Sequence, residues 1–98
     1  MGKIDENRAQ ALLKELSGWV REGDSIRRQF VFAGFPDAVA FIVRLGFTAE
    51  VADHHPGLLI DYKRVTATYT THSEGGLTEK DFEGAKAATS IAASLGGR

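Results

Sequence analysis

The sequence predicts one α+β domain over residues 1–98, with three helices packed on one face of a four-stranded antiparallel sheet, in the order α-β-β-α-β-β-α. Apolar residues recur at helical spacing in three separate stretches. Between these stretches lie two pairs of segments with strand-like alternation, and turn residues separate the segments. The length of 98 residues suits one domain with a modest core.

The first half of the pattern is a helix followed by a hairpin. A helix is expected over residues 5–17, because apolar residues recur at helical spacing until Gly18. Trp19 and Val20 then begin a short strand, which ends at a turn-like Glu-Gly-Asp sequence over residues 22–24. The alternation from residue 26 to residue 32 predicts the second strand of the hairpin.

The central helix is apolar around most of its circumference. Pro36 stands where a first helical turn tolerates proline, and the stretch DAVAFIVRLGFTAEVAD follows it. One sheet in so small a domain cannot bury all of this surface, so a second subunit is expected against the helix. We therefore predict a homo-oligomer, a dimer or a tetramer, with Phe41, Ile42 and Leu45 at its interface.

The second half has two strands and a last helix. Residues 58–62 and 65–72 read as strands, and the second has a clean period of two. Its threonines are expected to share one sheet face with His72 at the end. Thr78 and Asp81 resemble a capping box that opens a final helix. The inner face of that helix is predicted to carry Phe82, Ala85, Ala88, Ala92 and Leu95.

Composition excludes several classes of function. The formal net charge of −1 argues against a nucleic-acid partner, which normally requires a basic excess. The chain has no cysteine, so it has no disulfide, thiolate nucleophile or cysteine zinc site. No apolar run is long enough to span a membrane, and the N-terminus lacks the apolar core of a signal peptide. We expect a cytoplasmic protein.

The stretch EVADHHPGLLIDY, residues 50–62, contains two of the three histidines side by side. Histidine readily exchanges protons near neutral pH, which favours general acid–base chemistry without a cofactor. Glu50 lies four residues before His54, and Asp53 lies beside it, so either carboxylate could orient an imidazole. Pro56 pushes His55 out of the helical region and ends the long helix near His54.

Two further roles for the histidines remain open. A helix C-terminus favours histidine because the side chain complements the helix dipole and the last carbonyls. Alternatively, Glu50, His54 and His72 could form a facial set of metal ligands. Adjacent histidines rarely converge on one ion, so the sequence predicts acid–base chemistry and no metal.

The spacing of Glu50, the His54-His55-Pro56 run, Tyr62, His72 and Asp81 resembles the pattern of the pterin-4a-carbinolamine dehydratase family. The resemblance extends to Gly18-Trp19, to the alternating phenylalanines at 30 and 32, to the THSEGGLTEKD turn and to the helix order. It covers nearly the whole chain. It implies dehydration of a 4a-hydroxytetrahydropterin to a quinonoid dihydropterin, which recycles tetrahydrobiopterin for aromatic amino-acid hydroxylation.

The resemblance also implies roles for single residues. His54 and His72 are similar to the family's acids, and His55 to its substrate-holding base. Positions that line the pterin in the family are matched by Asp53, Thr70, Thr71 and Ser73, and supporting positions by Glu50, Pro56 and Asp81. Some relatives are instead interaction modules, either transcriptional coactivators or enzyme assembly factors. That non-catalytic function is the alternative, although three imidazoles at one site favour catalysis.

Overall fold

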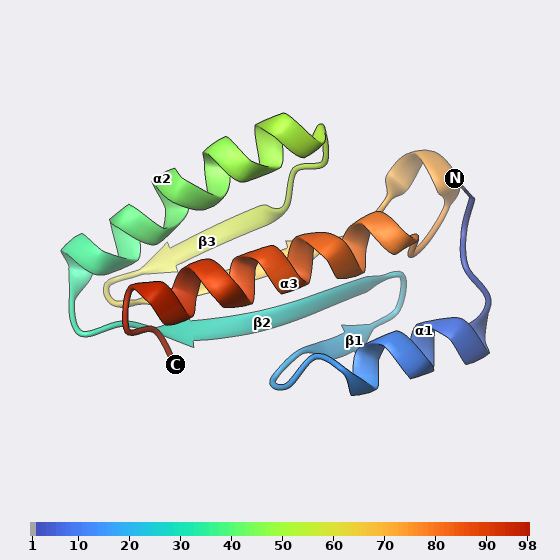
Figure 1. The fold of residues 1–98 in the computed structure, drawn as a ribbon, viewed down its shortest axis with the longest axis horizontal. Coiled ribbons are helices and arrows are strands. Elements are labelled where there is room, and N and C mark those ends of the chain that lie inside the picture. The colour runs from blue at the N-terminus through green and yellow to red at the C-terminus, as the bar shows by residue number, and fades with distance from the viewer. Residues whose placement is uncertain (1) are drawn as a thin grey trace.

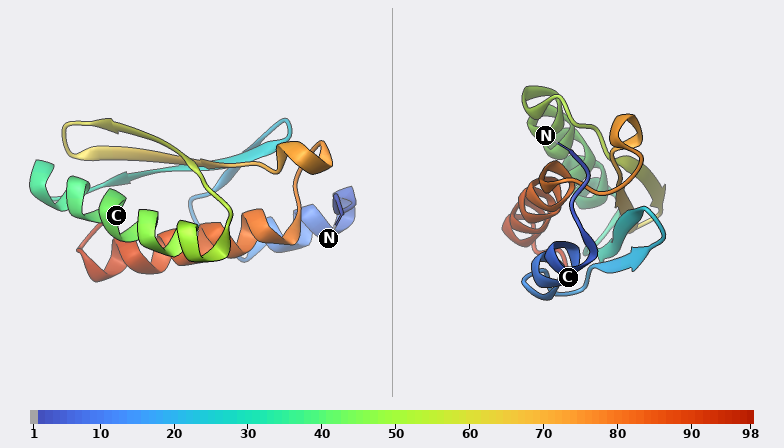
Figure 2. Two further views of the ribbon diagram at one scale, coloured as in Figure 1. Left: turned by 90° about the horizontal axis from the view of Figure 1, so that it is seen from above. Right: turned by 90° about the vertical axis from the view of Figure 1, so that its right-hand side faces the viewer.

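The computed structural model of the protein describes residues 2–98. It confirms the predicted class, with three helices on one face of a four-stranded antiparallel sheet. Figure 2 shows the sheet as one layer and the helices as a second layer on one side of it. The helices are α1 (Glu6–Lys14), α2 (Phe35–Ala52) and α3 (Glu79–Ser94). The strands are β1 (Val20–Glu22), β2 (Ser25–Val31), β3 (Gly57–Asp61) and β4 (Arg64–Tyr69), and a single 3-10 turn, η1 (His72–Glu74), precedes α3.

The sheet has the strand order β1-β2-β4-β3, and every neighbouring pair is antiparallel. The two central strands, β2 and β4, pair along their length, with Ile26 opposite Tyr69 and Phe30 opposite Val65. Because side chains alternate between faces, these four residues point to the helical layer together, and all four are buried. The core is therefore set by the register of the two central strands.

The helices cover the sheet with small and apolar residues. The inner face of α3 includes Phe82, Ala85, Ala88 and Ala92, as predicted, and all four are buried. Trp19 packs edge-on against Phe30, with ring centroids 6.0 Å apart, and donates a hydrogen bond of 2.9 Å to Thr89 on α3. The indole thus joins the hairpin to the last helix while its polar N–H remains satisfied.

The C-terminus of α2 determines where the paired histidines lie. Asp53 has a left-handed backbone, with φ of 52° and ψ of 41°. Its N–H donates to Glu50 O, and the N–H of His54 donates to Ala49 O, which together form a Schellman motif. Aspartate tolerates this conformation better than most residues that carry a Cβ. The helix therefore ends before His54, and the chain turns toward β3 at Pro56.

The prediction that His72 ends a strand is wrong. Strand β4 stops at Tyr69, and His72 begins η1 instead. An isolated bridge between Thr71 and Gly76 closes this segment into a tight loop, so His72 lies in that loop and outside β4. Figure 1 shows η1, the start of α3 and the loop after α2 at the same end of the molecule.

The residues predicted for the subunit interface are partly wrong. Phe41 and Leu45 are fully buried inside the protomer, because this face of α2 packs on the sheet and α3. The solvent-facing apolar residues of α2 are instead Phe35, Val39, Val43, Phe47 and Val51, of which Phe47 is 73% and Val51 90% exposed. Val39, Val43, Phe47 and Val51 are spaced four residues apart, so they form one stripe, here called the outer stripe. Within residues 2–98, no helix has the length and hydropathy needed to cross a membrane.

The first turn of α3 offers a test of the fold. Thr78 is the N-cap residue and is 1% exposed. We expect Thr78→Ala to lower the free energy of unfolding by about 1 kcal/mol, because an N-cap side chain is lost. Urea unfolding measures this difference, and Thr78→Ser, which keeps the hydroxyl, is the matched control. Equal stability of the alanine and serine variants would contradict the capping role.

Candidate active site

The side chain of His54 is held by the buried carboxylate of Asp81. Its Nε2 lies 2.6 Å from Asp81 Oδ1, and the two side chains are 12% and 0% exposed. Asp81 is the third residue of α3, so this contact joins the end of α2 to the start of α3. A short hydrogen bond shielded from water is stronger than an exposed one, because water does not compete for either partner.

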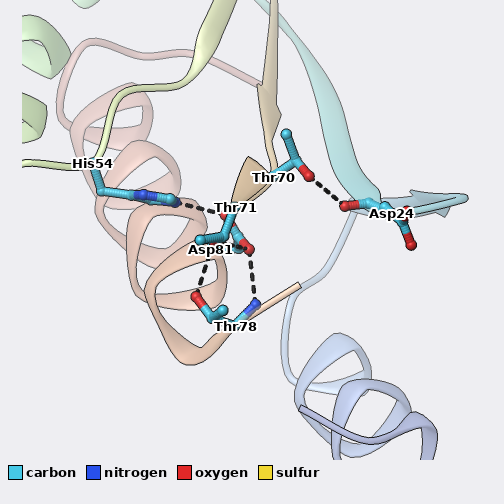
Figure 3. Close-up of polar contacts among 6 residues, drawn as sticks. All are labelled: Asp24, His54, Thr70, Thr71, Thr78 and Asp81. Atoms are coloured by element: carbon cyan, nitrogen blue, oxygen red, sulfur yellow. Dashed lines mark hydrogen bonds and ion pairs between the residues drawn. The ribbon is translucent and has the colours of Figure 1, made fainter. Parts of the chain in front are cut away.

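Asp81 is fixed in turn by two other groups. Its Oδ2 accepts from the backbone N–H of Thr78 at 2.9 Å and from the hydroxyl of Thr71 at 2.8 Å. The hydroxyls of Thr71 and Thr78 are 3.0 Å apart. Figure 3 shows His54, Thr71 and Thr78 arranged around the one carboxylate. The capping interaction predicted for Asp81 is thus present, and the same side chain also orients an imidazole.

The hydrogen bond to Asp81 fixes the tautomer of His54. An ionised carboxylate only accepts hydrogen bonds, so Nε2 carries the proton and Nδ1 is the other ring nitrogen. Within residues 2–98, no buried side-chain nitrogen or oxygen lacks a hydrogen-bond partner. Nδ1 has no partner in this part of the chain, so solvent reaches it. Nδ1 is therefore the atom through which His54 can exchange a proton with a ligand.

His55 forms a hydrogen bond with a different carboxylate, that of Glu50. Its Nε2 lies 2.7 Å from Glu50 Oε1, and the two side chains are 56% and 79% exposed. The sequence left open whether Glu50 or Asp53 orients an imidazole, and the structure shows Glu50 with His55 and Asp81 with His54. The left-handed residue Asp53 changes the helical phase, so the spacing of four between Glu50 and His54 does not bring them together. Exposure makes the Glu50 contact weak, and it orients the ring more than it stabilises the fold.

The other predicted residues lie around this end of the molecule, and they differ in exposure and in hydrogen bonding. His72 and Ser73 are exposed on η1. The hydroxyl of Thr70 donates to the backbone carbonyl of Asp24 at 2.6 Å, so Thr70 ties β4 to the turn between β1 and β2. Thr71 donates a hydrogen bond to Asp81.

The metal site that the sequence left open requires Glu50 and His54 to face one ion, yet each is paired with another residue. Within residues 2–98, no group of three or more candidate ligands is close enough to hold a metal.

Tyr69 is a site neighbour that sequence reasoning missed. Its ring stacks on His54, with centroids 5.9 Å apart and an angle of 20° between planes. Such aromatic pairs contribute about 0.5–1.5 kcal/mol beyond burial. The alternation of β4 places Tyr69 on the same face as Val65 and Ala67, but only the position of His54 after α2 in space reveals the contact between the two rings.

A cavity of about 260 Å³ lies beside this pair, between α2 and α3. Small residues on both helices leave the space open, and of the predicted site residues only His54 reaches it. The lining residues are Thr48, Ala49, Ala52, His54, Tyr69, Lys80, Glu83, Gly84 and Ala87.

Together, the fold and the two carboxylate-held imidazoles define a small α+β protein with a candidate acid–base site at one end of its helical layer. A family model described as pterin 4 alpha carbinolamine dehydratase matches residues 2–91. The chain belongs to this family, which confirms the resemblance seen in the sequence. Membership supports a dehydratase acting on a pterin carbinolamine, which is a lyase.

Individual relatives agree with this assignment. A protein of Roseiflexus sp. (strain RS-1) is 43% identical over 81 residues, which cover 83% of this chain and 87% of the relative. One from Sulfolobus acidocaldarius is 44% identical over 84 residues, which cover 86% and 92%. Both are named "Putative pterin-4-alpha-carbinolamine dehydratase". A crystal structure from Brucella melitensis, described as a transcriptional coactivator/pterin dehydratase, has a TM-score of 0.88 and 36% identity. The match covers 93% of this chain and 99% of that one.

The phenol of Tyr69 gives a pH test of the site. Burial, with a smaller contribution from the charge of Asp81, raises the pKa of Tyr69 to about 12. Because the folded pKa is above that of the unfolded chain, the stabilising contribution is complete below about pH 10 and is lost between about pH 10 and 12. Urea unfolding over this range should show the wild type losing about 1–2 kcal/mol more than Tyr69→Phe.

Tyr62→Phe is the matched control for this measurement, because it removes a hydroxyl from an exposed tyrosine. If Tyr69→Phe and the wild type lost stability in parallel, the phenol of Tyr69 would not be buried as described.

Proposed function

We propose that this protein dehydrates 4a-hydroxytetrahydropterin to quinonoid dihydropterin and water by histidine general acid–base catalysis. The observation that carries the proposal is the His54–Asp81 pair, which presents an oriented imidazole with one free nitrogen at the end of a dehydratase-family fold. The product would be reduced again to a tetrahydropterin, so the reaction serves tetrahydrobiopterin recycling for aromatic amino-acid hydroxylation.

The reaction needs one proton delivered and one removed. The bond between carbon 4a and the hydroxyl oxygen breaks, and an acid protonates the departing hydroxyl to give water. A base takes the proton from nitrogen 5, and the electrons of that N–H bond form the double bond between nitrogen 5 and carbon 4a. No electron is gained or lost overall, so side chains that exchange protons near neutral pH suffice.

His54 suits the acid because its orientation is fixed before substrate arrives. Asp81 holds Nε2, and a protonated Nδ1 would donate toward the leaving hydroxyl. The negative charge of Asp81 stabilises the imidazolium form of His54 before the proton is transferred. His72 is the second acid, on η1, and His55, oriented by Glu50, is the base that holds the substrate. Asp53, Thr70, Thr71 and Ser73 are proposed to line the pterin, Pro56 to shape the loop, and the site to need neither metal nor cofactor.

The three histidines should differ in their effect on the two epimers of the substrate. Carbon 4a is a stereocentre, so its hydroxyl leaves from one face of the ring or from the other. His54 ends the turn after α2 and His72 lies on η1, so each acid would serve one face. We expect His54→Ala to slow one epimer and His72→Ala the other by about 10²–10⁴-fold, while His55→Ala slows both.

Single-epimer kinetics with a synthetic carbinolamine measures these effects. Wild-type protein without any dehydration of either epimer would refute the proposed function itself. Equal impairment of both epimers by His54→Ala and His72→Ala would refute only the assignment of one acid to each face.

The alternative function is a non-catalytic interaction module, and one observation favours considering it. The Brucella melitensis structure carries the description transcriptional coactivator as well as pterin dehydratase. No residue of the outer stripe pairs with His54 or Asp81, so a binding role and catalysis are compatible in one chain. The dehydration assay separates the two functions, because an interaction module alone would leave the carbinolamine unchanged.

We propose that the protein is a homo-oligomer assembled through the outer stripe. Four apolar side chains at one helical face leave a continuous surface whose burial would be favourable, and a second copy offers the same surface in return.

A charge placed in this stripe should dissociate the oligomer. We expect Phe47→Glu to give a monomer by multi-angle light scattering, because an unpaired charge in an apolar interface is costly. Leu59→Glu is the matched control, since Leu59 is 69% exposed on β3 of the sheet and lies outside the stripe. A wild-type monomer at micromolar concentration, or dissociation by the Leu59 change alone, would contradict the proposal.

A further inference from the structure

We propose that Tyr69 is a positioning residue for His54, because its ring lies along one face of the imidazole and fixes the direction of Nδ1. The inference rests on the proposed function, in which Nδ1 delivers the proton. It extends that function to a residue that belongs to the sheet and touches no part of the proposed reaction itself.

The hydrogen bond to Asp81 alone does not fix Nδ1. The imidazole is attached to the chain through Cγ and held at Nε2, which lies across the ring from Cγ. Rotation about χ2 moves Nε2, which lies close to the rotation axis, less than it moves Nδ1, so the hydrogen bond tolerates small rotations that displace Nδ1. The χ2 torsion of histidine has broad, weakly separated minima and offers little resistance to this rotation. A flat surface against one face of the ring removes the freedom that remains.

Tyr69 supplies that surface. Its ring is within 20° of parallel to the imidazole in an offset stack, with 5.9 Å between centroids, so turning His54 would break this parallel arrangement. Tyr69 itself has little room to move, since it is 1% exposed and its backbone pairs with Ile26 in the centre of the sheet. Trp19, the residue before β1, packs against it, with 6.0 Å between ring centroids.

Gly84 on α3 leaves the space that the ring of Tyr69 occupies. A Cβ placed on Gly84 would lie 2.7 Å from Cζ of Tyr69 and closer still to its Cε1. Glycine within a helix is destabilising relative to alanine, so its place in the middle of α3 calls for a reason. The close approach of the Tyr69 ring supplies one. Strand β4, helix α3 and the turn after α2 therefore meet at the ring of Tyr69, which lies close to both Gly84 and His54.

Two kinds of variant separate the aromatic face from other properties of Tyr69. Tyr69→Leu keeps apolar volume but removes the flat ring, whereas Tyr69→Phe keeps the ring and removes only the hydroxyl. Gly84→Ala acts from α3, because the new methyl group would overlap the ring of Tyr69 and displace it. If Tyr69→Leu fails to fold, Gly84→Ala still tests the proposal.

The first measurement is made on the free protein and needs no activity. Carbon-detected or proton–carbon NMR of the three histidine rings resolves His54, whose ring protons feel the ring current of Tyr69. We expect Tyr69→Leu to abolish that shift and broaden the His54 signals, and Tyr69→Phe to retain both shift and sharpness. His54 signals that are unchanged in Tyr69→Leu and in Gly84→Ala would overturn the proposal.

The second measurement is single-epimer kinetics. We expect Tyr69→Leu to lower kcat for the epimer that depends on His54 by about tenfold with little change in KM, because misplacing a catalytic atom affects the reaction step. The epimer that depends on His72 should change less than about twofold, and Tyr69→Phe should restore the first epimer to within about threefold of wild type. A purely structural role predicts equal losses for both epimers, and that result would overturn the proposal. A wild type without activity would refute the proposed function, while the NMR result would still decide the position of the ring.

Discussion

The carboxylate of Asp81 is the contact on which the arrangement of this site depends. It accepts hydrogen bonds from His54, from the hydroxyl of Thr71 and from the backbone of Thr78, so three segments of the chain meet at one buried group. A buried carboxylate is costly unless its lone pairs are satisfied, and here donors surround it. The end of α2, the segment after β4 and the start of α3 are consequently fixed relative to one another. An imidazole so placed does not have to be reorganised when a ligand arrives.

The two neighbouring histidines differ sharply in environment, although they are adjacent in sequence. His54 is enclosed between Asp81 and the ring of Tyr69, whereas His55 and its partner Glu50 are exposed to solvent. The Schellman turn at Asp53 ends α2 before both residues, and beyond it His54 reaches Asp81 on α3 whereas His55 pairs back with Glu50 on α2. A shielded ring and a solvated one suit different tasks in a reaction that both gives and takes a proton.

Much of the fold was predictable from local patterns. Periods of 3.6 and 2, the proline at the start of α2 and the Thr78–Asp81 cap are short-range signals, and the structure confirms the elements they predict. The partner of His54 was not predictable from spacing, since Asp81 lies 27 residues away and reaches it only through the packing of α3. Likewise, a helix that is apolar on most sides does not reveal which side meets the sheet, so Phe41 and Leu45 were assigned to the wrong surface. His72 left its expected strand because a bridge between Thr71 and Gly76 ends β4 early.

The double role of Asp81 has an evolutionary consequence. The same carboxylate that holds His54 also caps the first turn of α3, so replacing the residue would loosen a helix as well as an imidazole. Selection for folding alone would then preserve this aspartate, even in a descendant that no longer catalysed any reaction. His72 and His55 carry no comparable structural duty, because both are exposed at the surface. Under the proposed function, loss of those two histidines in a diverged copy of this gene would therefore mark the loss of chemistry, whereas retention of the aspartate would mark only a chain that still folds.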